Sequence, residues 1–312
     1  MNRYTLIVCF ALVLLNCKGQ QTQTTPDANP IEVNTKIENY LFDTEALLKD
    51  VKELSSDAYE GRRTGTKGAE KARIYIIERF LQLGVTPLGS GYEQAFKFGN
   101  YDAENILGIV PGTEHTNKYI VLSAHYDHEG IKNGDIYNGA DDDASGISAL
   151  FAFATYFKTN PPKHNVILAA FDAEELGLKG AYHFVENSMI PKENIALNLN
   201  MDMISRSDKK ELFAVGSRYY PQLKPAIEGF QNLGQVKLVI GHEGLDSGDN
   251  WTNSSDHAAF HKAKIPFLYL GVADHEDYHK PTDDFERIHN QFYIDAVQTI
   301  IRLFETYDAM KL

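Results

Sequence analysis

Residues 166–177 read VILAAFDAEELG, six apolar residues that end at Phe171 and are followed by three acids within the next four positions. A short continuous apolar run is typical of a strand that is buried on both faces of a sheet. Two adjacent glutamates are common on a solvated helix but not at the end of a buried strand, because an unpaired carboxylate is costly to desolvate. Glu174 and Glu175 are therefore candidate functional groups. Since adjacent side chains point in different directions, one can bind a metal ion while the other stays free as a base.

Strand-like and helical segments alternate on both sides of this run. The further strand-like segments are 106–110, 119–123, 195–204, 236–240 and 266–270. The helical segments are one capped by Asp43, then 65–83, 143–157, a short helix from Gly177, 221–233, 256–262 and 290–310. This alternation predicts an α/β fold, a three-layer α/β/α sandwich with a mixed, largely parallel central sheet. No repeat or linker interrupts residues 39–312, which we expect to form one catalytic domain.

A histidine motif follows another predicted strand. AHYDH (124–128) comes directly after the apolar run 120–122, at the strand's C-terminal end, where open α/β sheets bind their ligands. Asp127 is close enough to accept the second ring N–H of His125, as carboxylates do for metal-bound histidines. The alternative is a polar turn without a ligand.

Two other places in the sequence carry acidic residues that the formation of helices and strands does not explain. GADDDASG (139–146) places three consecutive acids before a predicted helix. One helix cap needs only one of them, and three repel each other, so a nearby cation is expected. Asp202 is a lone acid in the apolar run 195–204 and should be paired or bound to metal. His279, in YHKPTD, is a weaker candidate, because a surface loop explains it equally well.

Taken together, these motifs suit one two-metal site. Two histidines and three carboxylates offer three negative charges to two divalent cations, and one hydroxide closes the balance. Such a site acidifies a water molecule shared by the two metals, and a free carboxylate can accept its proton.

The motifs resemble those of the di-zinc aminopeptidases, peptidase family twenty-eight, which includes bacterial leucyl aminopeptidases and aminopeptidase Y. The resemblance covers about residues 54–288. Eight motifs occur in order: SSDAYEGRRTGTKG, NILGIVPG, AHYDH, GADDDASG, FDAEELGLKGA, NMDM, SDHAAFHKAKIP and YHKPTDDFERI.

The resemblance implies a zinc-exopeptidase fold and specific residue roles. The implied ligands of two zinc ions are Asp142 for both, His125 and Asp202 for one, and Glu175 and His279 for the other. Glu174 would be the general base and Asp127 the partner of His125, and the peptide bond after Asp142 would be cis. Asp256 and His257 would shape the substrate pocket or merely cap a helix. Manganese and cobalt also suit a carboxylate-rich site.

The implied activity is that of a metallo-aminopeptidase that removes N-terminal residues from peptides. One alternative is a glutaminyl cyclase-like transferase, although those relatives hold one zinc and replace the DDDASG and EELGLKG contexts. Another is a carboxypeptidase, which needs a cationic pocket that Arg206 or Arg218 would supply. Trp251 either lines the pocket or packs locally. The histidines that match no family role are expected to be ordinary surface residues: His242, His261, His275 and His289.

Composition limits the partners, and the N-terminus predicts export. The 312 residues are 43% hydrophobic and carry a net charge of −13, which argues against nucleic acid and anionic lipid surfaces as partners. Residues 1–16 read as a signal peptide that ends in Leu14-Leu15-Asn16-Cys17, which looks like a bacterial lipobox. Cys17 would carry a lipid, 17–38 would be a flexible tether, and the monomer would face the periplasm or the cell exterior. An ordinary signal peptide is the alternative.

Overall fold

The structure is a computed structural model that describes Met1, residues 34–245 and residues 249–312. The predicted signal peptide, the lipid on Cys17 and most of the predicted tether lie outside the described residues. The folded unit begins at Asn34, whose side chain donates to the Gly234 carbonyl at 2.9 Å, while Thr35 pairs with Leu233. Residues 34–38 therefore belong to the folded unit and not to the tether, because they bond to a turn nearly 200 residues away. Among the described helices, none is long and apolar enough to cross a membrane.

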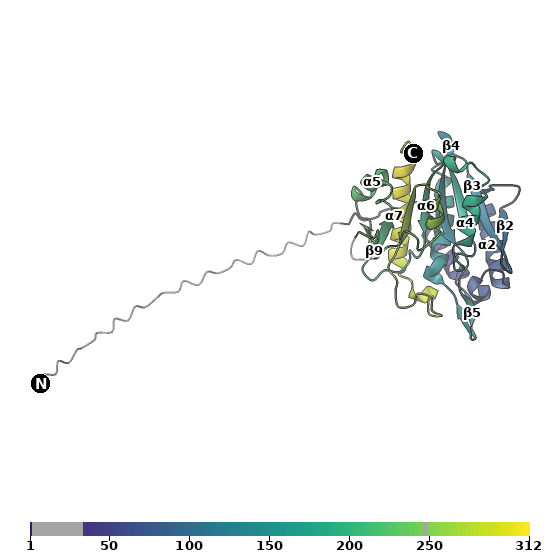
Figure 1. Cartoon of the computed structure of the whole chain (residues 1–312), viewed down its shortest axis with the longest axis horizontal. Helices are drawn as coiled ribbons and strands as arrows, with labels where there is room; N and C mark the ends of the chain where they lie inside the picture. Colours follow the sequence, from purple (N-terminus) through teal and green to yellow (C-terminus); the bar gives the residue numbers. More distant parts are fainter. Residues whose placement is uncertain (2–33, 246–248) are drawn as a thin grey trace. The chain divides into compact units, whose positions relative to one another are not determined.

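Nine strands of the described chain form one mixed sheet (Figure 1). Its order is β1 (Thr86–Pro87), β3 (Tyr101–Val110), β7 (His164–Phe171), β4 (His115–His125), β8 (Ile195–Met201), β11 (Phe267–Gly271), β9 (Glu211–Val215) and β10 (Lys237–Ile240), with β2 (Glu93–Phe98) paired to β3. The four central strands β7, β4, β8 and β11 are parallel, whereas β3 and β9 join them antiparallel. A separate hairpin consists of β5 (Gly130–Lys132) and β6 (Asp135–Tyr137).

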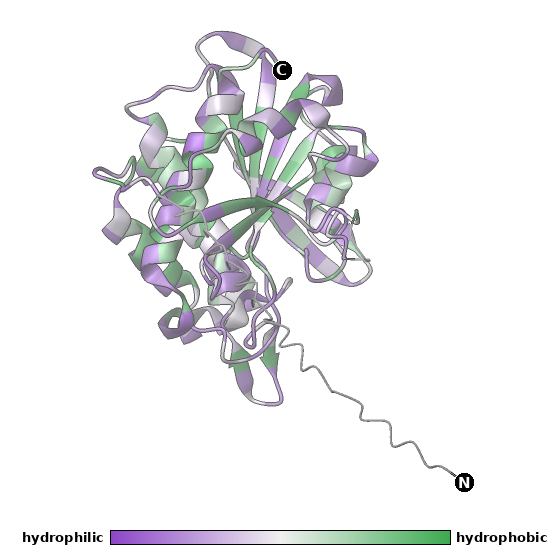
Figure 2. Cartoon of the chain, turned by 90° about the vertical axis from the view of Figure 1, so that its left-hand side faces the viewer, coloured by the Kyte–Doolittle hydropathy of each residue, from purple (hydrophilic) through white to green (hydrophobic). Residues whose placement is uncertain are grey.

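Helices cover both faces of the sheet. One layer contains α1 (Thr44–Leu54), α2 (Lys67–Leu83), α3 (Gly146–Phe157), α5 (Lys224–Glu228) and α7 (Asn290–Asp308), and the other contains α4 (Lys179–Glu186) and α6 (His257–Lys262). Strand side chains alternate between the layers: Ile120 and Leu122 pack into the first core, and Val121 packs into the second. Figure 2 shows the apolar strands in the interior and polar residues on the outer surfaces. The predicted three-layer α/β/α sandwich is confirmed.

Local signals predicted most elements, and the exceptions have physical causes. Asp43 caps α1 by accepting from the N–H groups of Glu45 and Ala46, and Gly84 ends α2 in the left-handed conformation. The helix expected over 221–233 is reduced to a 3₁₀ turn (Pro221–Leu223) and α5, because the chain beyond α5 turns to pair with Thr35. The acids 141–143 lie in an irregular turn, η2 (Ala140–Ser145), before α3. The sequence did not predict five of the strands, β1, β2, β5, β6 and β9.

Candidate metal centre

The candidate metal ligands meet at one edge of the sheet. His125 ends β4, Glu175 follows β7 by four residues, and Asp202 follows β8 directly. The loop after β11 carries His279. Because these four strands are parallel, their carboxyl ends share one edge, which is where open α/β sheets bind ligands.

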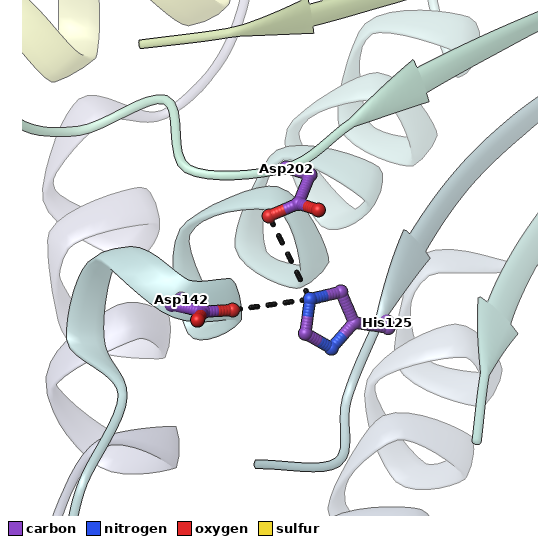
Figure 3. A group of neighbouring side chains, drawn as sticks. All are labelled: His125, Asp142 and Asp202. Atoms are coloured by element: carbon purple, nitrogen blue, oxygen red, sulfur yellow. Dashed lines mark ion pairs between the residues drawn. The ribbon is translucent and has the colours of Figure 1, made fainter. Parts of the chain in front are cut away.

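Asp142 lies at the centre of the cluster, and its first oxygen faces one group of side chains. Asp142 Oδ1 is 3.1 Å from His125 Nε2, and Asp202 Oδ1 is 3.6 Å from the same nitrogen (Figure 3). Ligand atoms around a tetrahedral zinc ion are about 3.4 Å apart, given Zn–N and Zn–O bonds of about 2.1 Å. The spacing of these three atoms therefore suits one shared cation.

The second oxygen of Asp142 faces another group. Oδ2 is 3.2 Å from His279 Nε2, which is itself 3.3 Å from Glu175 Oε2. The two oxygens of one carboxylate thus point to different histidine–carboxylate pairs. This is the arrangement that a carboxylate bridging two cations requires. The Asp142–Asp143 peptide bond is cis, as the family resemblance implies.

The residues at this centre fit divalent cations. Burial opposes the charged form of His279, yet Asp142 and Glu175 raise the pKa of its ring to about 10. Burial likewise opposes ionised Asp142, but three histidines (His128, His125 and His279) hold its pKa well below the usual range. Glu175 Oε1 is buried without a hydrogen-bond partner. Imidazole and carboxylate donors are those that zinc accepts, and crowded acids are relieved by positive charge.

The two acids beside Asp142 hold the surrounding backbone in place. Asp141 Oδ1 accepts from the N–H and hydroxyl of Ser205 at 2.6 and 2.7 Å, and its Oδ2 lies 3.0 Å from His275 Nε2. Asp143 accepts from the N–H of His125 at 3.2 Å and from that of Met203 at 3.2 Å. Asp141 and Asp143 therefore tie η2 to the segments that carry two candidate ligands. His275 is consequently not the ordinary surface residue that we expected.

Asp127 has a different contact pattern from the one expected. His125 Nδ1 lies 3.0 Å from the Asp127 main-chain carbonyl and 3.7 Å from its carboxylate. The carboxylate accepts instead from the N–H groups of Glu174 and Glu175, at 3.0 and 3.3 Å. The histidine is thus oriented by the Asp127 backbone, because the side chain is occupied in holding the segment after β7.

Two further residues, Arg62 and Asp283, fasten the centre from outside the candidate ligand set. Arg62 is fully buried and donates to four main-chain carbonyls, including those of Tyr126 at 2.8 Å and Gly139 at 2.9 Å. Asp283 accepts from the N–H groups of Asp141 and Asp142 at 3.1 Å. Both residues lie in the quoted motifs, but their partners are distant in sequence, so spacing alone could not assign these contacts.

A cavity of about 170 Å³ opens beside the candidate ligands. It is lined by His125, Asp142, Glu174, Asp202, Met203, Trp251, Ser254, Tyr269, Val272, Asp274, Tyr278 and His279. Burial, with Asp202 and Asp256 nearby, raises the pKa of Glu174 well above the carboxyl range. Burial also raises the pKa of Asp256 to about 8. Glu174 is thus a cavity-facing carboxyl whose affinity for a proton is unusually high.

The cavity wall is aromatic and acidic. Trp251 lines it and also stacks on His242 with ring centroids 3.6 Å apart, so this residue packs locally while facing the cavity. None of the described lining residues is a lysine or an arginine. Arg206 instead pairs with Asp277, and Arg218 donates to the Glu243 carbonyl at 2.7 Å.

Another histidine, His128, also reaches the centre, and sequence reasoning assigned it no role. Its Nδ1 lies 2.9 Å from Glu175 Oε1. The available signal was its place in AHYDH, directly after a predicted strand end.

Comparison with known proteins yields one family and several solved folds. The model of peptidase family M28 matches residues 105–304. Aminopeptidase YwaD of Bacillus subtilis is 30% identical over 199 residues, which cover 61% of this chain and 42% of that protein. The chain therefore spans less than half the length of this curated relative.

Two solved structures share the fold. The glutaminyl cyclase of Porphyromonas gingivalis has a TM-score of 0.71 at 17% identity, covering 86% of this chain and all of that one. A zinc aminopeptidase from Bacillus subtilis has a TM-score of 0.64 at 19% identity, covering 83% of this chain and 95% of that one. At such identities the likeness establishes the fold, which both activities use.

Proposed function

The chain belongs to peptidase family M28, and from this premise we propose that it is an aminopeptidase that binds two divalent metal ions, in the first instance zinc. One observation carries the proposal. The two oxygens of Asp142 lie 3.1 and 3.2 Å from the Nε2 atoms of His125 and His279, which belong to separate histidine–carboxylate pairs. Asp202 and Glu175 would complete the two positions.

Two metal ions held in this way would supply a Lewis acid for the peptide carbonyl and lower the pKa of a water molecule. Glu174 faces the same cavity, and we assign it the proton transfer from water to the leaving amine. Its neighbour Glu175 points into the cage, where its Oε2 lies 3.3 Å from His279. The adjacent glutamates therefore divide between base and ligand. Asp127, which holds both of their N–H groups, would position them.

The charge of the cavity favours a substrate with a free N-terminal amine. Its described wall contains Asp274 and Glu174 in addition to the proposed ligands, and no lysine or arginine. A carboxypeptidase needs a cation for the terminal carboxylate. The two arginines considered for that role are engaged elsewhere, Arg206 with Asp277 and Arg218 with Glu243.

Export and lipid attachment remain a proposal from the residues Leu14–Cys17 alone. We propose that Cys17 is lipidated and holds the enzyme on a bacterial membrane. Metabolic labelling with a fatty-acid analogue tests this directly: Cys17→Ser should abolish labelling and release the protein from the membrane fraction. Equal labelling of the variant and the parent would contradict it.

The activity is tested with the purified protein and two readouts. Zinc is counted per chain, and aminoacyl-nitroanilides are compared with their N-acetylated forms. We expect two zinc ions and cleavage of the free amines only. Cleavage of C-terminal residues from N-blocked peptides would favour a carboxypeptidase instead.

A peptide with N-terminal glutamine distinguishes an aminopeptidase from a glutaminyl cyclase. A peptide with N-terminal glutamine is incubated with the protein and its mass is followed. Loss of ammonia with the peptide otherwise intact, together with one zinc per chain, would identify a glutaminyl cyclase and overturn the proposal.

A further inference from the structure

His128 is a buried histidine that the proposed five-ligand cage leaves without a role. It follows β4 by three residues, and its side chain is 0% exposed. Neither of its ring nitrogens has a hydrogen-bond partner. A buried polar group without a partner is destabilising, so its presence calls for a group that it can bind.

The ring of His128 faces the carboxylates of Glu175 and Asp142, which belong to the same proposed metal position as His279. His128 Nδ1 lies 2.9 Å from Glu175 Oε1 and 3.7 Å from Asp142 Oδ2. The shorter approach has hydrogen-bond length, yet both of its atoms lack a hydrogen bond, because their orientation is not that of a donor and an acceptor. The two separations bracket the roughly 3.4 Å expected between neighbouring ligand atoms of a tetrahedral zinc ion.

The ring is also held in place. A side chain at position 139 would put its Cβ 2.7 Å from two ring atoms of His128, and Gly139 has a φ of +57°, which favours glycine. The Gly139 carbonyl accepts from Arg62 Nη2 at 2.9 Å. The wall behind the imidazole is therefore fixed, and a ring nitrogen of His128 lies within 4.8 Å of carboxylate oxygens of Asp142 and Glu175, a spacing that can hold a metal ion.

We propose that His128 Nδ1 is a further ligand of the metal ion bound by Asp142, Glu175 and His279. This inference rests on the proposed two-metal function. The position then has four protein ligands, whereas the His125–Asp202 position has three. Closed four-ligand sites are typical of firmly held zinc, and sites with three protein ligands keep a place for water or substrate. The two positions therefore differ in affinity, and the one with His128 fills first.

X-ray absorption of the zinc-loaded wild-type protein tests the assignment without turnover. At one equivalent of zinc, the ion should show two imidazoles, His128 and His279, and at two equivalents three histidines should be shared by two ions. A single imidazole on the first ion would overturn the proposal. Since this needs no variant, poor folding of a mutant does not remove the test.

Chelator competition gives a second, quantitative test. Losing a partner that only orients a ligand typically lowers metal affinity about 10- to 100-fold. His128→Ala should therefore weaken the tighter zinc step more than about 100-fold and leave the weaker step in place. His128→Asn, which keeps an amide N–H near the position of Nδ1, separates ligation from hydrogen bonding to Glu175. Full recovery of affinity in this variant with an unchanged imidazole count would show that His128 only positions Glu175, and would overturn the proposal.

The matched control is His289→Ala, which removes a half-buried histidine whose Nδ1 lies 3.3 Å from the Ser207 carbonyl. It should leave both zinc steps unchanged, and thermal unfolding confirms that each variant folds. A wild-type protein that binds two zinc ions but cleaves no aminoacyl substrate would contradict the proposed function and leave the assignment of His128 standing.

Discussion

Arg62 Nε donates a 2.8 Å hydrogen bond to the main-chain carbonyl of Tyr126, the residue between His125 and Asp127. The same guanidinium donates to the Gly139 carbonyl, three residues before Asp142. One buried cation thus joins the end of β4, which supplies the candidate ligand His125, to the turn that supplies Asp142.

Replacing this guanidinium should destabilise the fold. Arg62→Met keeps much of the stem volume but removes the guanidinium that donates to four buried carbonyls, and we expect a loss of roughly 3–5 kcal/mol in the free energy of unfolding. Urea denaturation measures it. The neighbouring Arg63→Met is the control: its partly exposed pair with Glu129 should contribute at most about 1 kcal/mol. Equal losses in the two variants would contradict the role given to Arg62.

Removing the proposed base should separate catalysis from metal binding. Glu174→Gln should retain its metal and lose at least about 10²-fold in kcat, the usual scale for general-base loss. Glu175→Gln should instead lose metal, because its carboxylate faces His279 at 3.3 Å. Metal content and steady-state kinetics of both variants are compared. Near-wild-type turnover by Glu174→Gln would contradict the assignment of Glu174 as the general base.

Acid should weaken the fold through His257. Burial lowers the pKa of this ring to about 3, below its unfolded value of about 6.5. The unfolded chain therefore binds the proton first. The contribution of the neutral ring is fully present above about pH 6.5 and is lost as the pH falls towards 3, by about 1.4 kcal/mol per pH unit.

The variant His257→Gln isolates this contribution. Glutamine can keep an N–H donor for the Trp251 carbonyl, which His257 Nε2 contacts at 2.8 Å, but it does not titrate. Urea unfolding in the presence of a chelator, at pH 6.5 and pH 5, should show the wild type losing about 2 kcal/mol relative to the variant. Parallel losses in the two proteins would show that His257 is not the titrating group.

Zinc should stabilise the protein through Asp142. A cation that binds only the folded chain adds about 2.7 kcal/mol when its free concentration is 100 times its dissociation constant. Thermal unfolding with zinc and with a chelator measures this increment. Asp142→Asn should remove most of it, whereas Asp135→Asn, an exposed acid on β6, should keep it. A full zinc response in Asp142→Asn would exclude this carboxylate as the shared ligand.

The features that could be predicted from the sequence are those fixed by residues close to one another in the chain. Asp43 and Gly84 act on their own helices, so their caps were predictable. His125, Glu175 and Asp202 were predictable because each ends or follows an apolar strand, and Asp142 because three acids are crowded before a helix; the family resemblance supplied their pairing and the role of His279. In contrast, β9 is a five-residue strand, and its place beside β11 depends on a partner more than 50 residues away.

The sequence predicted which residues lie near the candidate site better than it predicted which groups their side chains contact. Asp141 was recognised as one of three crowded acids, but its bonds to Ser205 and His275 depend on how distant loops meet. Asp127 was placed near His125, yet its carboxylate turns to the N–H groups of residues 174 and 175. His128 was passed over because its importance lies in orientation, which no spacing rule encodes.

The candidate cage draws four members from the ends of parallel strands or the loops after them, and Asp142 from the turn before α3; in chain order it begins at His125 and ends at His279. During synthesis on a ribosome, the second half of this cage does not exist until the loop after β11 has emerged. The position that needs His279 would therefore be completed only after every strand of the sheet has been synthesised. A chain truncated before residue 279 could still form most of the strands and yet never acquire a complete pair of metal positions.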